Sequence, residues 1–343
     1  MTDTGPRVLL LGSGELNDEL AAALGRLGAQ VLGADSVAGS MAPARGAELS
    51  ALLERVRPDF VAPEPSAVEI TADLERLRRL AADELGLPTA PFWFAGSAGE
   101  LASVAAHAGY PLSVRSVAHG QGWADRPSAL VTRREEVDGA WQRVVAAGPP
   151  RVMAESVVEV EAHVSLLAVS AGGPVIEFCP PIGYRRGQDG WLECWQPHQL
   201  SDAALDAARS IAARIVKAVG GRGVFGVDLM VNRDEVYFAD VSTFLPQSSW
   251  VTLRTQRLSA FELQARAILG LPLDTAPLSP GAARALLGGA PWGGALAAAL
   301  AVPQSDVRAG RPGIALATAT DVATARERVR EVADRLDVRD SRG

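Results

Sequence analysis

The sequence predicts a mixed α/β protein, and three observations support this class. Segments typical of strands and helices alternate over the first 65 residues, and several strand-like segments follow one another in the middle of the chain. Hydrophobic residues make up 48% and charged residues 21% of the chain, which are ordinary values for a globular protein. The chain has 343 residues, so more than one domain is expected.

The first part of the chain has the pattern of a small doubly wound unit. Short apolar runs predict strands, and apolar residues at helical spacing predict helices. Strands that alternate with helices pair in parallel through right-handed crossovers. A charged helix is expected next, over residues 71–86, because Gly86 and Pro88 end it. The expected strands cover residues 7–11, 29–34 and 58–62, and the expected helices cover residues 15–27 and 48–56.

The middle of the chain is predicted to be α+β, with residues 272–294 marking the boundary before a small C-terminal module. Helix starts are indicated by Ser97, with Glu100 three residues later, and by Ser201. Residues 224–242 have the pattern of a hairpin. Further strands are expected at residues 111–117, 151–158, 162–170, 174–183, 191–196 and 313–318. Further helices are expected at residues 97–109, 134–147, 201–220, 259–269 and 321–336.

The composition argues against several partners. The 33 basic and 40 acidic residues leave a net charge of −7, whereas nucleic-acid binding favours a basic face. The first apolar run, residues 8–11, is too short to span a membrane, and glycines and a proline interrupt residues 284–302. Cys179 and Cys194 fit small buried side chains in a reducing compartment. We therefore expect a cytoplasmic protein that binds neither nucleic acid nor a membrane.

Arginine dominates the basic residues. Lys217 is the one lysine among 33 basic residues, so the other 32 are arginines. Lys217 lies in an amphipathic helical pattern that is typical of a solvated surface residue. A mechanism that needs a lysine, as a Schiff base or as a point charge on a phosphate, must therefore use Lys217 or do without one.

A glycine-rich turn follows the first predicted strand. Gly12-Ser13-Gly14 opens a helix, where backbone N–H groups and the helix dipole can hold an anion. A dinucleotide-binding fingerprint would have a third glycine where Asn17 stands, while Asp35 lies where a ribose-binding acid would be expected. A tight turn beside an anionic ligand is the favoured interpretation, and a nicotinamide cofactor is the alternative.

Two acidic residues face each other on the predicted hairpin. Asp228 and Asp240 are placed at the same end of the two strands. Two carboxylates within reach of one Mg²⁺, completed by nucleotide phosphates, form a typical site for a hard cation. Two solvated acids on a sheet edge are the alternative.

Five sequence blocks occur in the order found in one known family: Gly12–Leu16, Arg78–Leu85, Trp195–Pro197, Val224–Leu229 and Gly313–Ala319. Through these blocks the chain resembles the formate-dependent phosphoribosylglycinamide formyltransferases of the ATP-grasp superfamily, as a divergent member. The resemblance covers nearly the whole chain. It implies an ATP-grasp fold with a small C-terminal module. It also implies a shortened N-terminal doubly wound domain, because the segment that usually forms a fourth strand is missing after Glu64.

The resemblance also implies an activity and a domain division. Family members use ATP and Mg²⁺ to turn formate into formyl phosphate, which the amine of a ribonucleotide then attacks, and they form homodimers. We accordingly expect an enzyme of the ligase or formyltransferase type that acts on a small molecule, such as a ribonucleotide or an amine. The expected domains are a substrate-side domain at 1–66, an ATP-grasp domain at 67–272 and a C-terminal domain at 273–343.

The resemblance transfers candidate site residues position by position, without assigning a catalytic residue. Asp228 and Asp240 occupy the two metal positions, where the family has glutamate. Each change removes one methylene, so an ion would sit closer or bind through water. The substrate positions carry Glu15, Leu16, Glu64 and Arg311. The nucleotide positions carry Arg115, Glu155, Val158 and His163. The family's loop rich in Ser, Gly and Lys is replaced by residues 118–123, where His119, Gly120 and Gly122 are expected to form a replacement anion site.

The nucleotide positions depart furthest from the family. Leu74 and His163 stand where the family has a basic residue and an acid, and Arg115-Ser116 replaces Lys-Pro. The family's Arg-Pro-His-Asp is replaced by residues 244–247. Each lost charge-assisted contact costs roughly 1.5–3 kcal/mol, so weak ATP binding is expected. Two hypotheses follow: an ATP-grasp enzyme of altered specificity, or an ATP-independent relative that is a binding protein or pseudoenzyme.

Overall fold

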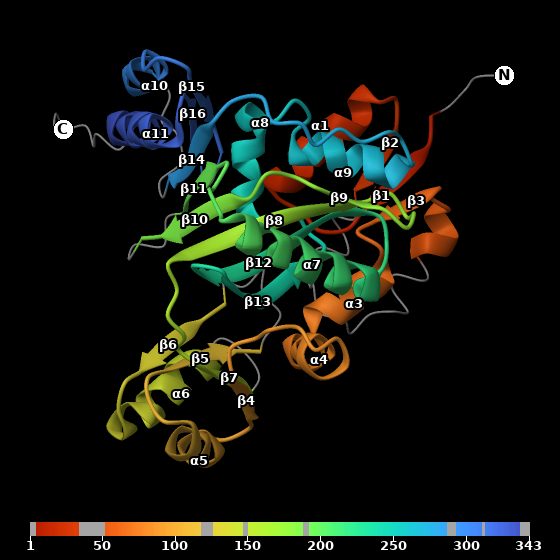
Figure 1. The fold of residues 1–343 in the computed structure, drawn as a ribbon. Helices are drawn as coiled ribbons and strands as arrows, with labels where there is room; N and C mark the ends of the chain where they lie inside the picture. The colour runs from red at the N-terminus through yellow and green to blue at the C-terminus, as the bar shows by residue number, and fades with distance from the viewer. Residues whose placement is uncertain are drawn as a thin grey trace.

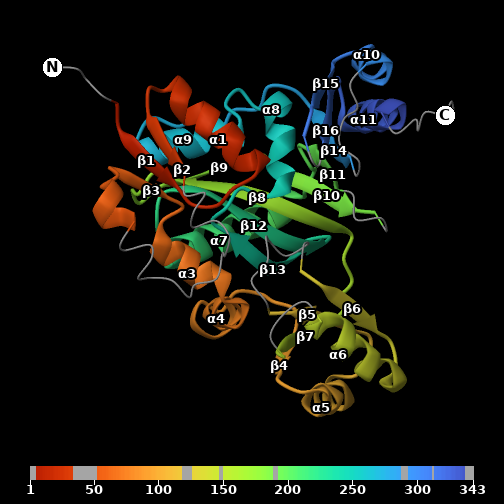
Figure 2. The ribbon, with the colours of Figure 1, turned by 180° about the vertical axis from the view of Figure 1, so that it is seen from behind.

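The fold is described by a computed structural model that covers residues 5–33, 52–117, 126–146, 150–187, 192–286, 293–310 and 313–336. The described strands form three sheets, of three, four and nine strands. Figure 1 shows the nine-stranded sheet at the centre, with the four-stranded sheet in a lobe below it. Figure 2 shows the same lobe from behind, so the lobe projects from the body of the molecule in both views.

The three-stranded sheet has the order β2–β1–β3 and is parallel throughout. Its core contains Val8 and Leu10 of the central strand together with Leu20 and Leu24 of the first helix. Among the described residues before 66 there are three strands, which agrees with the predicted shortened unit. Residues 52–56 are helical, whereas Asp35 lies outside the described residues. The elements are β1 (Arg7–Leu10), α1 (Glu15–Arg26), β2 (Gln30–Gly33) and β3 (Phe60–Ala62).

The nine-stranded sheet is antiparallel and runs β13–β12–β8–β10–β11–β14–β16–β15, with β9 also paired to β8. The predicted hairpin is confirmed as β12 (Gly223–Asn232) and β13 (Glu235–Ser242), which turn through Arg233 and Asp234. The other strands are β8 (Ala162–Ser170), β9 (Ile176–Phe178), β10 (Ile182–Arg186), β11 (Leu192–Gln196), β14 (Gly281–Leu286), β15 (Ser305–Arg308) and β16 (Gly313–Thr318).

Two strand predictions in this sheet were wrong. The strand expected over 174–183 is two strands, because Pro180 and Pro181 lack the N–H groups that a strand ladder needs. β14 lies inside 272–294, whose prolines and glycines indicated only a boundary. Because β14 pairs with both β11 and β16, the sheet continues into the C-terminal segment. The division into three domains stays a prediction.

Helices cover both faces of the nine-stranded sheet, because successive residues of a strand point to opposite sides. Leu166 and Phe225 pack with α7 (Asp202–Val219), which Ser201 caps by accepting a hydrogen bond from the Ala204 N–H. Leu167 and Val224 pack with α9 (Ala260–Leu269) on the other face. The remaining helices here are a 3₁₀ helix (Gln247–Val251), α8 (Thr252–Thr255), α10 (Gly294–Leu300) and α11 (Val322–Leu336), of which α11 lies on β14 and β16.

The four-stranded sheet is antiparallel, in the order β4–β7–β5–β6. Two helices cover one face, and the other face contributes Met153 and Phe92 to a cluster with Met230 and Ala239 of the nine-stranded sheet. This cluster joins the lobe to the body. The elements are β4 (Phe92–Ala95), α5 (Ala98–Ala108), β5 (Leu112–Ser116), β6 (Ser128–Val131), a 3₁₀ turn (Arg134–Glu136), α6 (Val137–Val145) and β7 (Val152–Ser156).

The single charged helix expected over 71–86 is corrected to three shorter segments. They are α3 (Pro65–Ala72), α4 (Leu74–Arg79) and a π-helical turn (Leu80–Glu84). Asp73 breaks the helix because its backbone is extended, and its side chain accepts the Arg76 N–H to start α4. None of the described helices is both long enough and apolar enough to cross a membrane.

Candidate nucleotide and amine sites

Asp228 and Asp240 lie side by side on the nine-stranded sheet. They are direct partners in the β12–β13 register, on the face opposite α7, and a β-bulge follows them. Asp240 is buried, and its Oδ1 accepts the Val241 N–H at 2.8 Å. Burial raises the pKa of Asp240, while the guanidinium of Arg126 and then those of Arg78 and Arg115 oppose this effect. Asp240 therefore sits in a desolvated environment with three arginines nearby, whereas Asp228 is half-buried.

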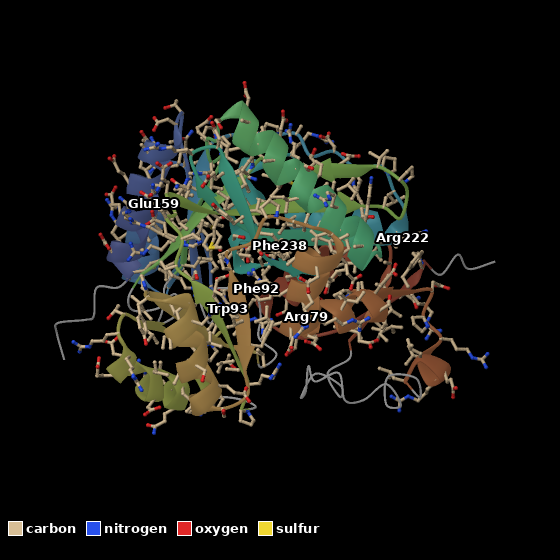
Figure 3. All side chains as sticks on the ribbon, turned by 60° about the horizontal axis from the view of Figure 1, so that its bottom comes forward. Arg79, Phe92, Trp93, Glu159, Arg222 and Phe238 are labelled. Atoms are coloured by element: carbon tan, nitrogen blue, oxygen red, sulfur yellow. The ribbon has the colours of Figure 1, made fainter. Side chains whose placement is uncertain are left out.

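Arg78 is a buried residue that contacts both the nine-stranded sheet and the four-stranded sheet. Its Nη1 donates to the carbonyls of Phe238 and Ala239 at 3.1 and 3.0 Å, directly before Asp240. Its Nη2 donates to Glu155 Oε1 at 2.7 Å, and its guanidinium lies 4.6 Å from the Phe92 ring centroid. Phe92 and Phe238, from β4 and β13, are labelled near the centre of Figure 3. Arg78 thus connects the lobe to the strand that carries Asp240.

Arg115 and Arg126 add positive charge to the same place. Arg115 lies on β5, and burial lowers its pKa while the Glu155 carboxylate opposes the shift. Arg126 is buried at the start of the described segment that contains β6. The two guanidiniums act on each other, and both act on Asp240. A guanidinium fork suits bidentate contact with phosphate oxygens, so this group can bind an anion beside the two carboxylates.

His163 and Tyr184 also lie close to Arg115, and Tyr184 interacts with the carboxylates of Asp228 and Asp240. They are register partners on β8 and β10, with ring centroids 5.8 Å apart. His163 is exposed at its surface side, whereas partial desolvation of its imidazole, and then Arg115, lower its pKa and favour the neutral form. Burial, and then the Asp228 carboxylate, raise the pKa of the buried Tyr184, which keeps its phenol protonated. Both rings can therefore exchange hydrogen bonds with a ligand without carrying charge.

Glu155 and Val158, the expected adenine contacts, lie close to this cluster. Glu155 is 4% exposed and accepts its hydrogen bond from Arg78, and burial raises its pKa. Val158 packs in the apolar cluster that contains Leu74 and Met153. Leu74 is fully buried there, so this position contributes to the core and presents no charge. The nucleotide contacts assigned to Glu155 and Val158 stay predictions.

A second feature is a cavity of about 320 Å³ beside the start of α1. Glu15 and Leu16, two predicted substrate residues, line it. Glu64 is not among the described residues of its wall: this side chain precedes α3 and accepts the Arg222 N–H at 3.2 Å. The structure therefore brings Glu15 and Leu16 to the cavity and directs the Glu64 carboxylate to a backbone contact elsewhere. Their roles in substrate binding stay predictions.

Four predicted residues lie outside the described residues. His119, Gly120 and Gly122 belong to the expected phosphate loop, and Arg311 to the expected substrate site.

Three residues that lie around Asp228 and Asp240 were not predicted as site residues from the sequence: Arg78, Arg126 and Tyr184. One signal could have found Arg78, because it shares the buried face of α4 with Leu74 and Leu77. An arginine among apolar residues at helical spacing indicates a buried partner. We see no comparable signal for Arg126 or Tyr184.

Comparisons with known proteins agree with this arrangement of sheets. The sequence model of the ATP-grasp domain matches residues 80–261, which is more than half of the chain, so the protein is an ATP-grasp protein. Curated formate-dependent phosphoribosylglycinamide formyltransferases from Rhodococcus jostii and Paraburkholderia xenovorans are 38% and 37% identical to it. These alignments cover 98% and 97% of this chain and 96% and 95% of the relatives. The chain belongs to the formate-dependent phosphoribosylglycinamide formyltransferase family.

Solved structures confirm the predicted ATP-grasp fold. Glycinamide-RNase-transformylase T from Mycobacterium tuberculosis matches with a TM-score of 0.81 and 51% identity, over 96% of this chain and all of that one. An Aspergillus clavatus N5-carboxyaminoimidazole synthase, solved with ADP and 5-aminoimidazole ribonucleotide, matches at 0.80 with 21% identity, over 97% and 99%, and supports the fold alone. Membership in this family confirms the expectation of an ATP-grasp enzyme, and it does not favour the alternative of a non-catalytic relative.

Proposed function

We propose that the protein uses ATP to activate a small carboxylate as an acyl phosphate and transfers the acyl group to an amine. The main support is the pair Asp228 and Asp240, together with the guanidiniums of Arg78, Arg115 and Arg126 that act on Asp240. Phosphoryl transfer needs positively charged groups in contact with the anionic phosphates, and it needs hard oxygen ligands that bind a divalent ion. The cluster offers both.

The donor set at the aspartates fits Mg²⁺. Asp228 and Asp240 supply hard carboxylate oxygens on one face of the sheet. Ser165, the partner of Asp228 on β8, is fully buried, and its hydroxyl has no hydrogen-bond partner in the described part of the chain. Mg²⁺ is commonly held by one or two carboxylates together with phosphates and water. When bound, the ion would neutralise phosphate charge at this place.

The other charged and polar side chains near the two aspartates are assigned either to phosphate binding or to orienting the nucleotide. We assign Arg115 and Arg126 to the phosphate oxygens, because their forks bind two oxygens at once. The neutral His163 and Tyr184 would orient the nucleotide through hydrogen bonds. The carboxylate substrate is formate, as the names of the curated relatives suggest. The family resemblance further supports a homodimer located in the cytoplasm, which size-exclusion chromatography with light scattering and cell fractionation would test.

Measurement of ADP release with ATP, Mg²⁺, formate and a panel of amines tests the function. Asp240→Asn should reduce this activity strongly, because it removes one of two carboxylates from a proposed ion site. Asp206→Asn, on the exposed side of α7, is the matched control and should keep the parent activity. If the parent neither binds ATP in calorimetry nor releases ADP with any amine, the proposal is wrong.

Nucleotide affinity should be weaker than in the curated relatives. Leu74 is buried in an apolar cluster, so it cannot supply the charge that the family places at this position. A side-by-side calorimetric titration of ATP with Mg²⁺, against the Rhodococcus jostii relative, measures the difference. One lost phosphate contact corresponds to a Kd roughly tenfold to a hundredfold higher. Equal affinity would show that other residues compensate.

A further inference from the structure

Three polar residues form a row across neighbouring strands of the nine-stranded sheet. Ser165 of β8 lies opposite Asp228 of β12, and Asp228 lies opposite Asp240 of β13. Figure 1 shows these three strands as neighbours near the centre of the molecule. Direct partners in a ladder point to the same face of the sheet, with Cβ atoms about 4.5–5.5 Å apart. The Ser165 hydroxyl is therefore within reach of the Asp228 carboxylate, whereas Asp240 is one strand further away.

Strand alternation directs the Ser165 side chain away from α7. Val164 and Leu166, the neighbours of Ser165 along β8, pack in the core that contains residues of α7. On the opposite face, Ser165 stands between His163, which lies close to Arg115, and Leu167, which belongs to the core that contains α9. Ser165 thus lies at the border between the apolar core and the polar residues around the two aspartates.

The Ser165 hydroxyl is buried without a hydrogen-bond partner. The residue is 0% exposed, and its Oγ has no partner in the described part of the chain. A buried hydroxyl that has lost its hydrogen bonds to water destabilises the folded chain unless another group replaces them. Of its two ladder partners, Ile182 of β10 is apolar, and Asp228 carries a carboxylate that can accept a hydrogen bond.

A second serine on the same strand shows how a structural hydroxyl is satisfied. Ser170 is also buried, on the face that carries α7. Its hydroxyl donates to the Gly221 carbonyl at 3.0 Å and accepts the Gly172 N–H at 3.3 Å. Ser170 therefore connects three backbone segments, whereas no such contact accounts for the hydroxyl of Ser165.

We infer that Ser165 is a positioning residue of the ion site, whose hydroxyl donates a hydrogen bond to the Asp228 carboxylate when the two aspartates hold a divalent cation. This inference rests on the proposed function, whose ion site it extends. A carboxylate can accept a hydrogen bond at one oxygen and bind a cation with the other. Rotation about one side-chain torsion of Ser165 is enough to redirect its hydroxyl. A hydrogen bond of this kind fixes the orientation of a carboxylate that binds a metal ion.

Mn²⁺ is the probe for the binding test, because electron paramagnetic resonance measures the free ion directly. The full-length protein is titrated with Mn²⁺, with and without ADP. Ser165→Ala should weaken Mn²⁺ binding roughly tenfold, the lower end of the effect typical for a lost hydrogen bond to a metal ligand. Ser170→Ala is the matched control and should bind Mn²⁺ as the parent does. Parent-like binding by Ser165→Ala overturns the inference, as does an absence of Mn²⁺ binding by the parent in both titrations.

Stability without any divalent ion separates a positioning role from a structural one. Ser165→Ala removes a hydroxyl that has no partner, so its urea midpoint should equal or exceed that of the parent. Ser170→Ala removes two hydrogen bonds, so its midpoint should fall. A lower midpoint for Ser165→Ala would show that its hydroxyl already serves the ion-free fold, and this result overturns the inference.

A double-mutant cycle tests whether Ser165 acts through Asp228. In an Asp228→Asn background, Ser165→Ala should change Mn²⁺ binding in the presence of ADP by less than about twofold, because the group that it orients has lost its charge. A further tenfold loss in the double variant means that the two residues act independently, and it overturns the inference.

Kinetics with ATP and formate separate this inference from the proposed function. The Mg²⁺ concentration for half-maximal ADP release should rise roughly tenfold in Ser165→Ala, with a smaller change in the rate at saturating Mg²⁺. Weaker Mn²⁺ binding by Ser165→Ala, in a protein that releases no ADP, supports the role of Ser165 and counts against the proposed function. An unchanged Mg²⁺ requirement in an active Ser165→Ala variant overturns the inference and leaves the proposed function intact.

Discussion

Two buried glutamates, each held by arginine, differ in the direction of their pKa shifts. The Glu193 side chain is fully buried between β11 and α11 and accepts hydrogen bonds from Arg185, Arg326 and Arg330. Burial alone would raise its pKa, but hydrogen bonds from Arg330 and Arg326 outweigh burial and lower the pKa to about 2. Glu155 is 5% exposed at its side chain, and there burial prevails over Arg78 and raises the pKa.

The difference separates a structural cluster from a candidate site. The arginines around Glu193 are 24–48% exposed, so water helps to solvate the cluster that fastens the last helix to the sheet. Arg78 and Glu155 are both almost completely desolvated, and Asp240 and Arg115 add further charge nearby. Desolvated charges that shift each other's pKa values are typical of functional sites.

The largest expected effect is on Arg78. Arg78→Ala leaves Glu155 buried without its direct partner and removes the donor to the carbonyls of Phe238 and Ala239. Breaking a buried ion pair costs about 3–5 kcal/mol in free energy of unfolding. Arg79→Ala, one residue further along and 59% exposed, is the control and should cost less than about 1 kcal/mol. Urea denaturation measures both, and equal losses would contradict the buried contacts of Arg78.

The next effect is on Glu193. Glu193→Gln keeps the shape but weakens the contacts to the arginines of α11, so we expect a loss of about 2–3 kcal/mol at pH 7. Because the folded pKa of about 2 lies below the ordinary 4.5, this stabilisation is present above pH 4.5. The difference between parent and variant should therefore shrink as the pH falls from 4.5 towards 2.

Glu155 should show the opposite pH dependence. Its folded pKa is raised, so the stability that it contributes falls as the pH rises above 4.5 through the folded pKa. The parent should therefore lose stability relative to Glu155→Gln as the pH rises through that range. Parallel pH profiles for the two Gln variants would contradict the comparison of the two clusters.

Local patterns explain which parts of the fold were predictable. The hairpin at 224–242 follows from alternating residues and a short turn, and its register then pairs Asp228 with Asp240. The contacts of Arg78 could not be predicted, because its acceptors lie 12 to 161 residues away in the chain. β14 was missed because its partners β11 and β16 stabilise a segment whose flanks resemble a linker.

A smaller effect is expected at Gly183, next to the Glu193 cluster. Trp195 packs over this glycine, and a Cβ there would lie 2.5 Å from the indole ring. Trp195 also stacks with Arg326, at 3.9 Å from the guanidinium carbon to the ring centroid. Gly183→Ala must move the indole, which costs about 1–3 kcal/mol in free energy of unfolding. Gly173→Ala, which has open space, is the control, and an equal loss there would argue against crowding at Trp195.

The smallest effect is expected at an exposed ion pair beside Arg78. Glu75 lies on α4 near Arg78, and Arg151, just before β7, donates to it at 2.6 and 2.8 Å. The same two segments are thus joined twice, once in the core and once at the surface, where the side chains are 41% and 23% exposed. Hydrogen bonds from Arg151 lower the pKa of Glu75, so this contribution is lost as the pH falls below 4.5.

Salt distinguishes the surface pair from the buried pair. Water and ions screen the exposed charges, so Arg151→Ala should cost less than about 1 kcal/mol, and the loss should shrink between 0.1 and about 1 M salt. The loss caused by Arg78→Ala should change little over the same range, because solvent does not reach that pair. Urea denaturation at both salt concentrations measures the two variants together. If Arg151→Ala costs more than about 2 kcal/mol, or if salt affects both variants equally, then burial does not set the difference between the two ion pairs.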